Sequence, residues 1–281
     1  MATLPAAIIY RITDPDENDA KTEHVSFLPK VFNDKTTKSV GPYVNEYVGT
    51  FLLTSVVSLA VATGKVAAPI AAGLMFMAMT FSGAYVSGTH VNPAVTAGLF
   101  FRKGGDRSKA VGYGVAQILG ALMAAGLSHT ALGSEVCKGK ILPQLGQGVT
   151  EGQAMGAEML FTGLLLQAVF SFGAQGTPTA VLAIAGTLMA GLAAAGGVSG
   201  GALNPAVATG LYLKNAAGNQ INNLYIYWLG PMLGAVLVAL VNKKIGEDES
   251  LGGKAQSDAQ NRAQGAMNDA QAAFNNAMPQ Q

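Results

Sequence analysis

The chain has 281 residues, of which 50% are hydrophobic and 12% are charged, and its formal net charge is +1. Soluble domains carry about 25% charged residues, so a molecular surface that mainly faces water is excluded. The net charge gives no basis for binding nucleic acid, and the single cysteine, Cys137, excludes a disulfide framework within the chain. The first residues show no cleavable signal pattern. The composition therefore predicts an integral membrane protein whose first hydrophobic span serves as the membrane signal.

Six segments meet the length and composition expected of membrane-spanning helices. Such a helix needs about 20 mostly apolar residues. The predicted spans are 43–63, 67–88, 108–132, 154–174, 178–198 and 222–242. The sequence before the first span and after the last is polar, which predicts an N-terminal tail at 1–42, a membrane region at 43–243 and a C-terminal tail at 244–281.

Basic residues near the ends of the spans predict the orientation of the chain in the membrane. With six spans, the basic positions before the first, after the second and after the sixth lie on one side, which should be the cytosol. These positions are Lys35, Lys38, Arg102, Lys103, Arg107, Lys109, Lys243 and Lys244. Both termini are therefore expected in the cytosol, and the loop at 133–153 on the outside.

An internal duplication organises the chain. Asn92-Pro93-Ala94 returns as Asn204-Pro205-Ala206, 204 − 92 = 112 residues later, and the same offset separates Glu46 from Glu158. The two repeats cover about 43–132 and 154–243, with three full spans in each. Because three is odd, the second repeat must enter the membrane from the opposite face, which places a central site near the membrane midplane.

Each Asn-Pro-Ala sequence has the features of a helix start inside the membrane. Asn is a good N-cap, and Pro suits the first helical position. The predicted helices, 93–101 and 205–213, are about 13.5 Å long at 1.5 Å per residue, close to half of the roughly 30 Å hydrocarbon core. Two half-helices that meet at the midplane imply a water-filled cavity, since exposed backbone is tolerated there only against protein or water.

The chemistry at that meeting point favours a neutral, hydrogen-bonding permeant. Two helix N-termini, each carrying roughly +0.5 charge, face each other there. The side-chain oxygens of Asn92 and Asn204 can cap the helices while their NH₂ groups point into the pore. A water or hydroxyl oxygen would be held there, whereas a cation or a proton would meet positive potential from both sides.

These residues resemble the aquaporin (major intrinsic protein) family. The resemblance rests on SGTHVNPAVT, the second Asn-Pro-Ala, the acidic positions in NEYVGTFLL and AEMLFTGLL, AQILGA and YWLGPMLGA. It covers about 43–243. It implies an all-α fold of six transmembrane helices and two half-helices in inverted three-span repeats. It further implies no cofactor and no metal, and a homotetramer in membrane lipid with one pore per protomer.

The resemblance also suggests roles for three polar residues. Glu46 and Glu158 are expected to brace the backbones of the pore loops, the alternative for carboxylates within a membrane being proton relay. His90 matches a family histidine near the cytosolic mouth. It is expected to brace the first loop, and a pH gate is the alternative.

The chain departs from the family at the narrow filter. Most members have Arg directly after the second Asn-Pro-Ala, where this chain has Val207, and glycerol-conducting members usually have Asp at the position of Ala208. The other filter positions fall on Ala72, Leu192 and Gly201. Only backbone carbonyls near 199–202 would remain to hold a permeant. We therefore expect a wider, less polar filter that admits water, glycerol, urea, ammonia or hydrogen peroxide and excludes ions less strictly. Because Gly201 replaces the usual filter cysteine, mercurial block through the pore is not expected.

The sequence is also compatible with two functions other than a passive channel. The first is a closed or structural, adhesive membrane protein of the same fold, with a pore closed by Leu192, Val207 or a tail. The second is a secondary transporter with saturable, ion-coupled flux. An enzyme is not expected, because the sequence shows no nucleophile–base pair, metal-ligand spacing or phosphate loop.

Overall fold

The computed structural model describes residues 35–64, 67–133, 136–137, 141–173, 178–215 and 218–245. The chain divides into two units, Met1–Ala239 and Leu240–Gln281, and each is described by itself. Most of the two predicted tails lies outside the described residues. The described part of the first unit is helical and contains no strand.

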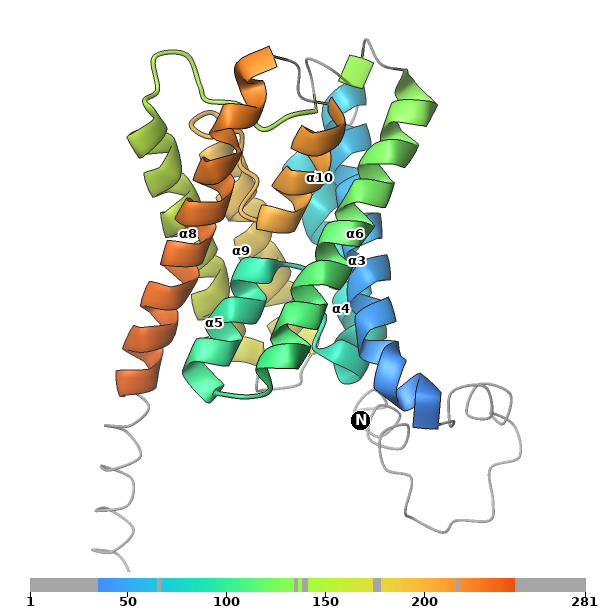
Figure 1. Cartoon of the computed structure of the whole chain (residues 1–281). Helices are drawn as coiled ribbons and strands as arrows, with labels where there is room; N and C mark the ends of the chain where they lie inside the picture. The colour runs from blue at the N-terminus through green and yellow to red at the C-terminus, as the bar shows by residue number, and fades with distance from the viewer. Residues whose placement is uncertain are drawn as a thin grey trace, which may run out of the picture. The chain divides into compact units, whose positions relative to one another are not determined.

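Six long helices and two short ones make up the described chain (Figure 1). The long helices are α3 (Lys35–Thr63), α4 (Ala68–Ser87), α6 (Arg107–Leu132), α8 (Glu151–Phe172), α9 (Pro178–Gly196) and a final helix at 226–245 that follows the 3₁₀ segment η3 (Gly218–Tyr225). The short helices are α5 (Pro93–Lys103) and α10 (Pro205–Asn215). The order of long and short helices is the same in both repeats, as the duplication predicted.

The helix bounds differ from the predicted ones mainly at two kinds of position. α3 begins at Lys35 and not at 43, so that Pro42 lies inside the helix. A helix can continue into polar sequence beyond the membrane, and the proline costs it one backbone donor near its start. α5 and α10 each reach two residues further than predicted. The last residue of α5 is Lys103, and Gly104 caps the helix. The N–H of Gly104 donates to the carbonyl of Phe100, and its φ of 70° stops the helix.

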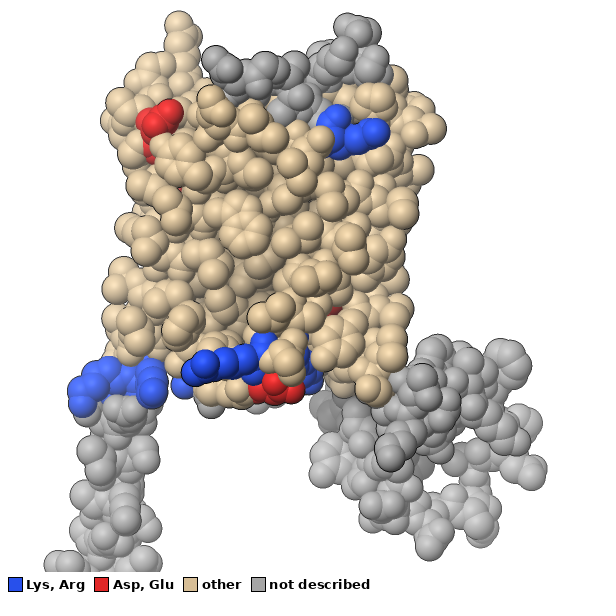
Figure 2. All heavy atoms as spheres, viewed as in Figure 1, with Lys and Arg blue, Asp and Glu red and all other residues tan. Residues whose placement is uncertain are grey.

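The outer surface of the long helices is suited to lipid. Six spans of 18 to 26 residues are long and apolar enough to cross a membrane, and at most 39% of any spanning window is buried within the protein. On α6 an exposed apolar side chain recurs every four residues, at Val111, Val115, Leu119, Met123 and Leu127. Figure 2 shows a broad band almost free of Lys, Arg, Asp and Glu between two charged ends. The protein is therefore an integral, multi-pass membrane protein.

The helices of each repeat pack closely through glycine. α3 packs mainly on α6 and α4, α9 packs on α8 and α4, and α10 packs on α6. A Cβ atom on Gly120 of α6 would overlap the carbonyl oxygen of Tyr47, and one on Gly234 of the final helix would overlap the carbonyl oxygen of Met159. A Cβ on Gly230, one turn earlier, would lie 2.8 Å from the carbonyl oxygen of Met155, so the Gly230–Gly234 spacing allows the final helix to approach α8 closely.

The two short helices approach each other from opposite ends of the bundle. Figure 1 shows α5 in the lower half of the view and α10 in the upper half. The C-terminal end of α5 is fixed by Arg102, whose guanidinium carbon lies 4.4 Å from the centre of the Phe170 ring on α8. The first loop (87–92) leads into α5 and the second loop (199–204) leads into α10, so that the two loops meet in the middle of the fold.

Candidate functional site: two re-entrant loops and a cavity

The two Asn-Pro-Ala sequences are joined to each other across the repeats. Asn92 Oδ1 accepts from the N–H of Ala94 at 2.9 Å, and its Nδ2 donates to the carbonyl of Leu203 at 2.8 Å. Asn204 does the same in reverse: Oδ1 accepts from the N–H of Ala206 at 3.0 Å, and Nδ2 donates to the carbonyl of Val91 at 2.8 Å. One N–H of each amide is thus engaged by the other loop, which leaves the second one to face the cavity.

The proline and alanine of each sequence stand where the helix starts require them. Pro93 and Pro205 occupy the first position of α5 and α10. Ala94 and Ala206 are fully buried and supply the backbone N–H groups that the asparagines cap. A longer side chain at either position would have to be accommodated inside the protein, since both alanines have no exposed surface.

In each loop, the residue before the asparagine has a left-handed backbone conformation that points its N–H and its carbonyl toward different partners. Val91 and Leu203, directly before the two asparagines, have φ of 43° and 49°. This left-handed conformation costs about 1–2 kcal/mol for a residue with a Cβ. It directs the N–H of each residue toward a buried carboxylate and its carbonyl toward the opposite asparagine. These hydrogen bonds hold the strained conformation in place.

Glu46 lies behind the first loop and is fully buried. Its Oε1 accepts from the hydroxyl of Ser87 at 2.5 Å and from the N–H of His90 at 2.8 Å. Its Oε2 accepts from the N–H of Val91 at 2.6 Å and from Nε2 of Gln117 at 2.7 Å. Four donors converge on one side chain, so that each of its two oxygens accepts two hydrogen bonds.

Glu158 occupies the equivalent place behind the second loop and is also fully buried. Its Oε1 accepts from the hydroxyl of Ser199 at 2.6 Å and from the N–H of Ala202 at 2.9 Å, and its Oε2 accepts from the N–H of Leu203 at 2.6 Å. The serine, the carboxylate and two consecutive backbone N–H groups therefore recur in both repeats.

His90 links the first loop to α5 and α6. Its Nδ1 lies 3.1 Å from the hydroxyl oxygen of Thr96, which also accepts from Nε2 of Gln117 at 3.1 Å. Its ring meets the Tyr113 ring edge to face, with centroids 5.2 Å apart, and the Tyr113 hydroxyl donates to the carbonyl of Ser87 at 3.0 Å. His90 is thus held on three sides and also lines the cavity.

A cavity of about 540 Å³ passes both loops. Its wall includes both asparagines, His90 and all four positions expected to form the filter. These filter residues are Ala72, Leu192, Gly201 and Val207. They come from α4, α9, the second loop and α10, so the fold brings together positions that are far apart in the sequence.

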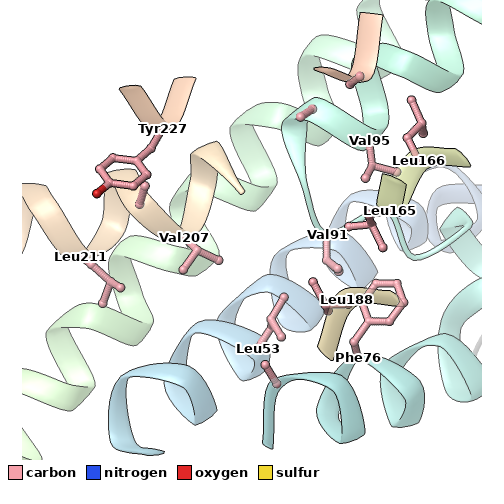
Figure 3. Packing of buried hydrophobic residues seen from close by; sticks show 14 of the residues in the cluster. Leu53, Phe76, Val91, Val95, Leu165, Leu166, Leu188, Val207, Leu211 and Tyr227 are labelled. Atoms are coloured by element: carbon pink, nitrogen blue, oxygen red, sulfur yellow. The ribbon is translucent and has the colours of Figure 1, made fainter. Parts of the chain in front are cut away.

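The filter residues offer no charged or hydrogen-bonding side chain. Val207 is buried at 4% exposure, and Leu211 follows it one turn later on the same side of α10 (Figure 3). Leu53 of α3, Phe76 of α4 and Leu188 of α9 line the same cavity. Gly201 has φ of 62°, and a Cβ there would lie 2.9 Å from the carbonyl oxygen of Leu192. The second loop therefore passes close to α9 at the filter.

The carbonyl of Ser199, which was expected to be able to hold a permeant, is bonded to a tyrosine hydroxyl instead. Among the carbonyls near 199–202, that of Ser199 accepts from the Tyr227 hydroxyl at 2.5 Å, and Ser199 is fully buried. Gly200, Gly201 and Ala202 line the cavity, whereas Ser199 is not part of its described wall. Sequence reasoning missed this tyrosine because it lies 28 residues from its partner.

Cys137 lies in the connection between the two repeats, and its side chain is fully buried. Its Sγ lies 3.6 Å from the carbonyl oxygen of Ser128. Burial raises the pKa of the Cys137 thiol, which lowers the thiolate fraction at a given pH. The cavity wall described above does not include it.

Comparison with known proteins agrees with this architecture. The sequence model of the major intrinsic protein family matches residues 33–242. The chain is 31% identical over 223 residues to a glycerol uptake facilitator protein-like 6 from Lactiplantibacillus plantarum, an alignment that covers 74% of this chain and 99% of the relative. It is 32% identical over 235 residues to aquaporin AqpM from Methanothermobacter marburgensis, with coverage of 70% and 94%.

A solved structure shares the fold. The X-ray structure of the aquaglyceroporin from Plasmodium falciparum superimposes with a TM-score of 0.65 at 21% identity, covering 73% of this chain and 96% of that one. The six spans and the two half-helices define a membrane channel of the aquaporin fold. The chain belongs to the major intrinsic protein family, and it is a channel for water or small solutes and not an enzyme.

Proposed function

We propose that the protein is a passive, single-file pore for small neutral solutes as well as water, with a filter that is wider and less polar than one containing arginine. The observation that carries this proposal is that Ala72, Leu192, Gly201 and Val207 line one cavity together with Asn92 and Asn204. Candidate permeants are glycerol, urea, ammonia and hydrogen peroxide. The similarity to a glycerol uptake facilitator protein-like relative supports the inclusion of solutes larger than water.

The asparagine amides would select for hydrogen-bonding permeants in the middle of the pore. Each amide has one N–H left after its bond to the opposite loop. The N-termini of α5 and α10 add positive potential there, which disfavours cations. An arginine about 8 Å from a passing cation would add about 2 kcal/mol to that barrier at an effective dielectric constant near 20. Without it, we expect ion exclusion to persist in weaker form.

Glu46 and Glu158 act in this proposal as braces for the loops. Every oxygen of both carboxylates accepts hydrogen bonds from the loops or from Gln117. A proton relay needs an acceptor that is open to the permeant, and these oxygens face backbone N–H groups instead. Within the same proposal His90 braces the first loop, both termini are cytosolic and the protein assembles as a homotetramer.

The test is stopped-flow light scattering on proteoliposomes, with gradients of water, glycerol and urea. The wild type is compared with Val207→Arg, which restores a charge, and with Val207→Leu, which adds bulk alone. We expect the wild type to conduct solutes, Val207→Arg to conduct mainly water, and Val207→Leu to fall between them. Size-exclusion chromatography establishes that each variant is folded. Wild-type fluxes no greater than those of empty liposomes would overturn the proposal in favour of a closed or structural protein. Saturable flux that depends on an ion gradient would point to a transporter.

A further inference from the structure

The connection between the two repeats contributes to the cavity wall. Ile141 and Leu142 are buried, and both line the cavity with Pro143. Gly200 and Gly201 of the second loop line the same cavity, and Gly200 lies directly against Pro143. The segment 141–149 therefore meets the cavity beside the filter residue Gly201, although it is neither a spanning helix nor a half-helix.

Pro143 is held from two directions. Gly200 packs against it so closely that a Cβ on Gly200 would lie 2.6 Å from Cα of Pro143, and its φ of 84° also suits glycine. From the other side the hydroxyl of Tyr212 donates to the Pro143 carbonyl at 2.7 Å. A second tie joins the N–H of Gly146 to the carbonyl of Val198 at 2.9 Å. Within the described chain, these two hydrogen bonds attach the 141–149 segment to the second repeat.

Tyr212 of α10 is buried beside the cavity and does not belong to its described wall. It is 2% exposed, and its ring lies 5.6 Å from that of Tyr227, whose hydroxyl holds the carbonyl of Ser199. The residue before it, Leu211, lines the cavity. Adjacent positions of α10 therefore supply a residue of the cavity wall and the hydrogen bond that holds the 141–143 segment.

We propose that Tyr212 is a specificity-determining positioning residue: its hydroxyl holds the Ile141–Pro143 wall in place and so limits the size of solute that passes the apolar filter. The proposal rests on the proposed function, since it concerns the selectivity of the same pore. A filter of small and aliphatic residues sets no firm limit through hydrogen-bonding geometry. The limit on size then depends on how firmly the surrounding wall is fixed. The solutes affected are linear polyols longer than glycerol.

The variant that tests this is Tyr212→Phe, which keeps the ring against Tyr227 and removes only the hydroxyl. Loss of one net hydrogen bond shifts a local opening equilibrium by about 2- to 10-fold. We expect the permeability ratio of a five-carbon polyol to glycerol to rise by that factor, with water permeability unchanged. Tyr225→Phe is the matched control, because it removes a hydroxyl that donates to exposed Glu151 at 2.6 Å, away from the cavity.

A second readout follows the wall without requiring flux. In a Cys137→Ser background, Leu142→Cys introduces the only thiol of the chain, and its rate of labelling by a soluble maleimide reports how often the wall opens. We expect Tyr212→Phe to raise this rate about 2- to 10-fold and Tyr225→Phe to leave it unchanged.

The two readouts distinguish the possible failures. An unchanged labelling rate overturns the positioning role. Faster labelling with an unchanged polyol ratio in a conducting channel overturns the role in specificity. Faster labelling in a protein whose wild type conducts nothing overturns the proposed function, while it still supports the role of Tyr212 in holding the wall.

Discussion

The first and second loops share one framework and differ in the side chains that surround it. In both, a buried glutamate accepts from a serine hydroxyl and from two consecutive backbone N–H groups. In both, a tyrosine hydroxyl donates to the carbonyl of that serine. Around the first loop, however, stand His90, Thr96 and Gln117. The second loop has Ala202 and Ala208 at the positions equivalent to His90 and Thr96.

The comparison shows which residues the architecture requires. The serine, glutamate and tyrosine recur behind the start of both half-helices, whereas Gln117 adds a further donor to Glu46 at the first loop alone. The second loop keeps the same backbone geometry with the aliphatic Val207 directly after its Asn-Pro-Ala sequence, at a position expected to belong to the filter. The side chains that hold the loops are therefore different from those proposed to set the selectivity.

The largest effect is expected from breaking the shared framework. Glu46→Gln and Glu158→Gln each replace an acceptor with an NH₂ group that faces a donor, and each leaves at least one buried backbone N–H unpaired. We expect each to cost about 2–4 kcal/mol of stability, because the two loops depend equally on their braces. Thermal unfolding in detergent measures this. Glu151→Gln, at the exposed start of α8, is the control and should be near neutral. A brace variant as stable as the wild type would show that its loop is held in another way.

The next effect concerns the asparagines where the loops meet. Asn92→Asp and Asn204→Asp keep the helix cap but remove the bond to the opposite carbonyl and add a negative charge. A carboxylate about 6 Å from a passing cation is worth about 2–3 kcal/mol at an effective dielectric constant near 20. We therefore expect cation conductance in planar bilayers to rise at least about tenfold in both variants. Asn92→Ala removes the same bond without the charge and should not conduct cations. Conductance in only one Asp variant would mean that the two loops do not face the permeant equally.

A smaller effect is expected from the polar side chains found only around the first loop. His90→Ala removes the contact with Thr96 and should cost about 1 kcal/mol, and Thr96→Val, which removes the same contact from the other side, should cost about as much. Since His90 is expected to brace the loop, wild-type solute permeability should change by less than about twofold between pH 5.5 and 8, where histidine titrates. A steep pH dependence that His90→Ala abolishes would instead support a pH gate.

The smallest effect is expected at Cys137. Its thiol is buried and its pKa is raised by burial, so less thiolate is present at a given pH and labelling should accelerate only above the usual titration range of a thiol near pH 8.5. Mercurial reagents at neutral pH should leave solute flux unchanged. Inhibition that persists in Cys137→Ser would contradict the assignment of Gly201 to the filter.

The sequence predicts the parts of this fold that depend on local pattern. The six spans follow from hydrophobic length, and the inverted repeats follow from the common offset of the two Asn-Pro-Ala sequences. Both half-helices follow from Asn and Pro at a helix start. The sequence does not predict the left-handed conformation of Val91 and Leu203, because β-branched valine and bulky leucine both disfavour it. Nor does it predict the cross-repeat bonds of Asn92 and Asn204 or the tie between Tyr212 and Pro143, which exist only once distant segments have met.

The reciprocal bonds between Asn92 and Leu203 and between Asn204 and Val91 have a consequence for the synthesis of the protein. The first loop cannot be completed while only the first repeat has emerged from the ribosome, because its partner carbonyl and amide are more than a hundred residues away. We therefore expect a half-made chain to have three spans and a first loop without its cross-repeat hydrogen bonds. The path across the bilayer should then be completed only when the second repeat is inserted.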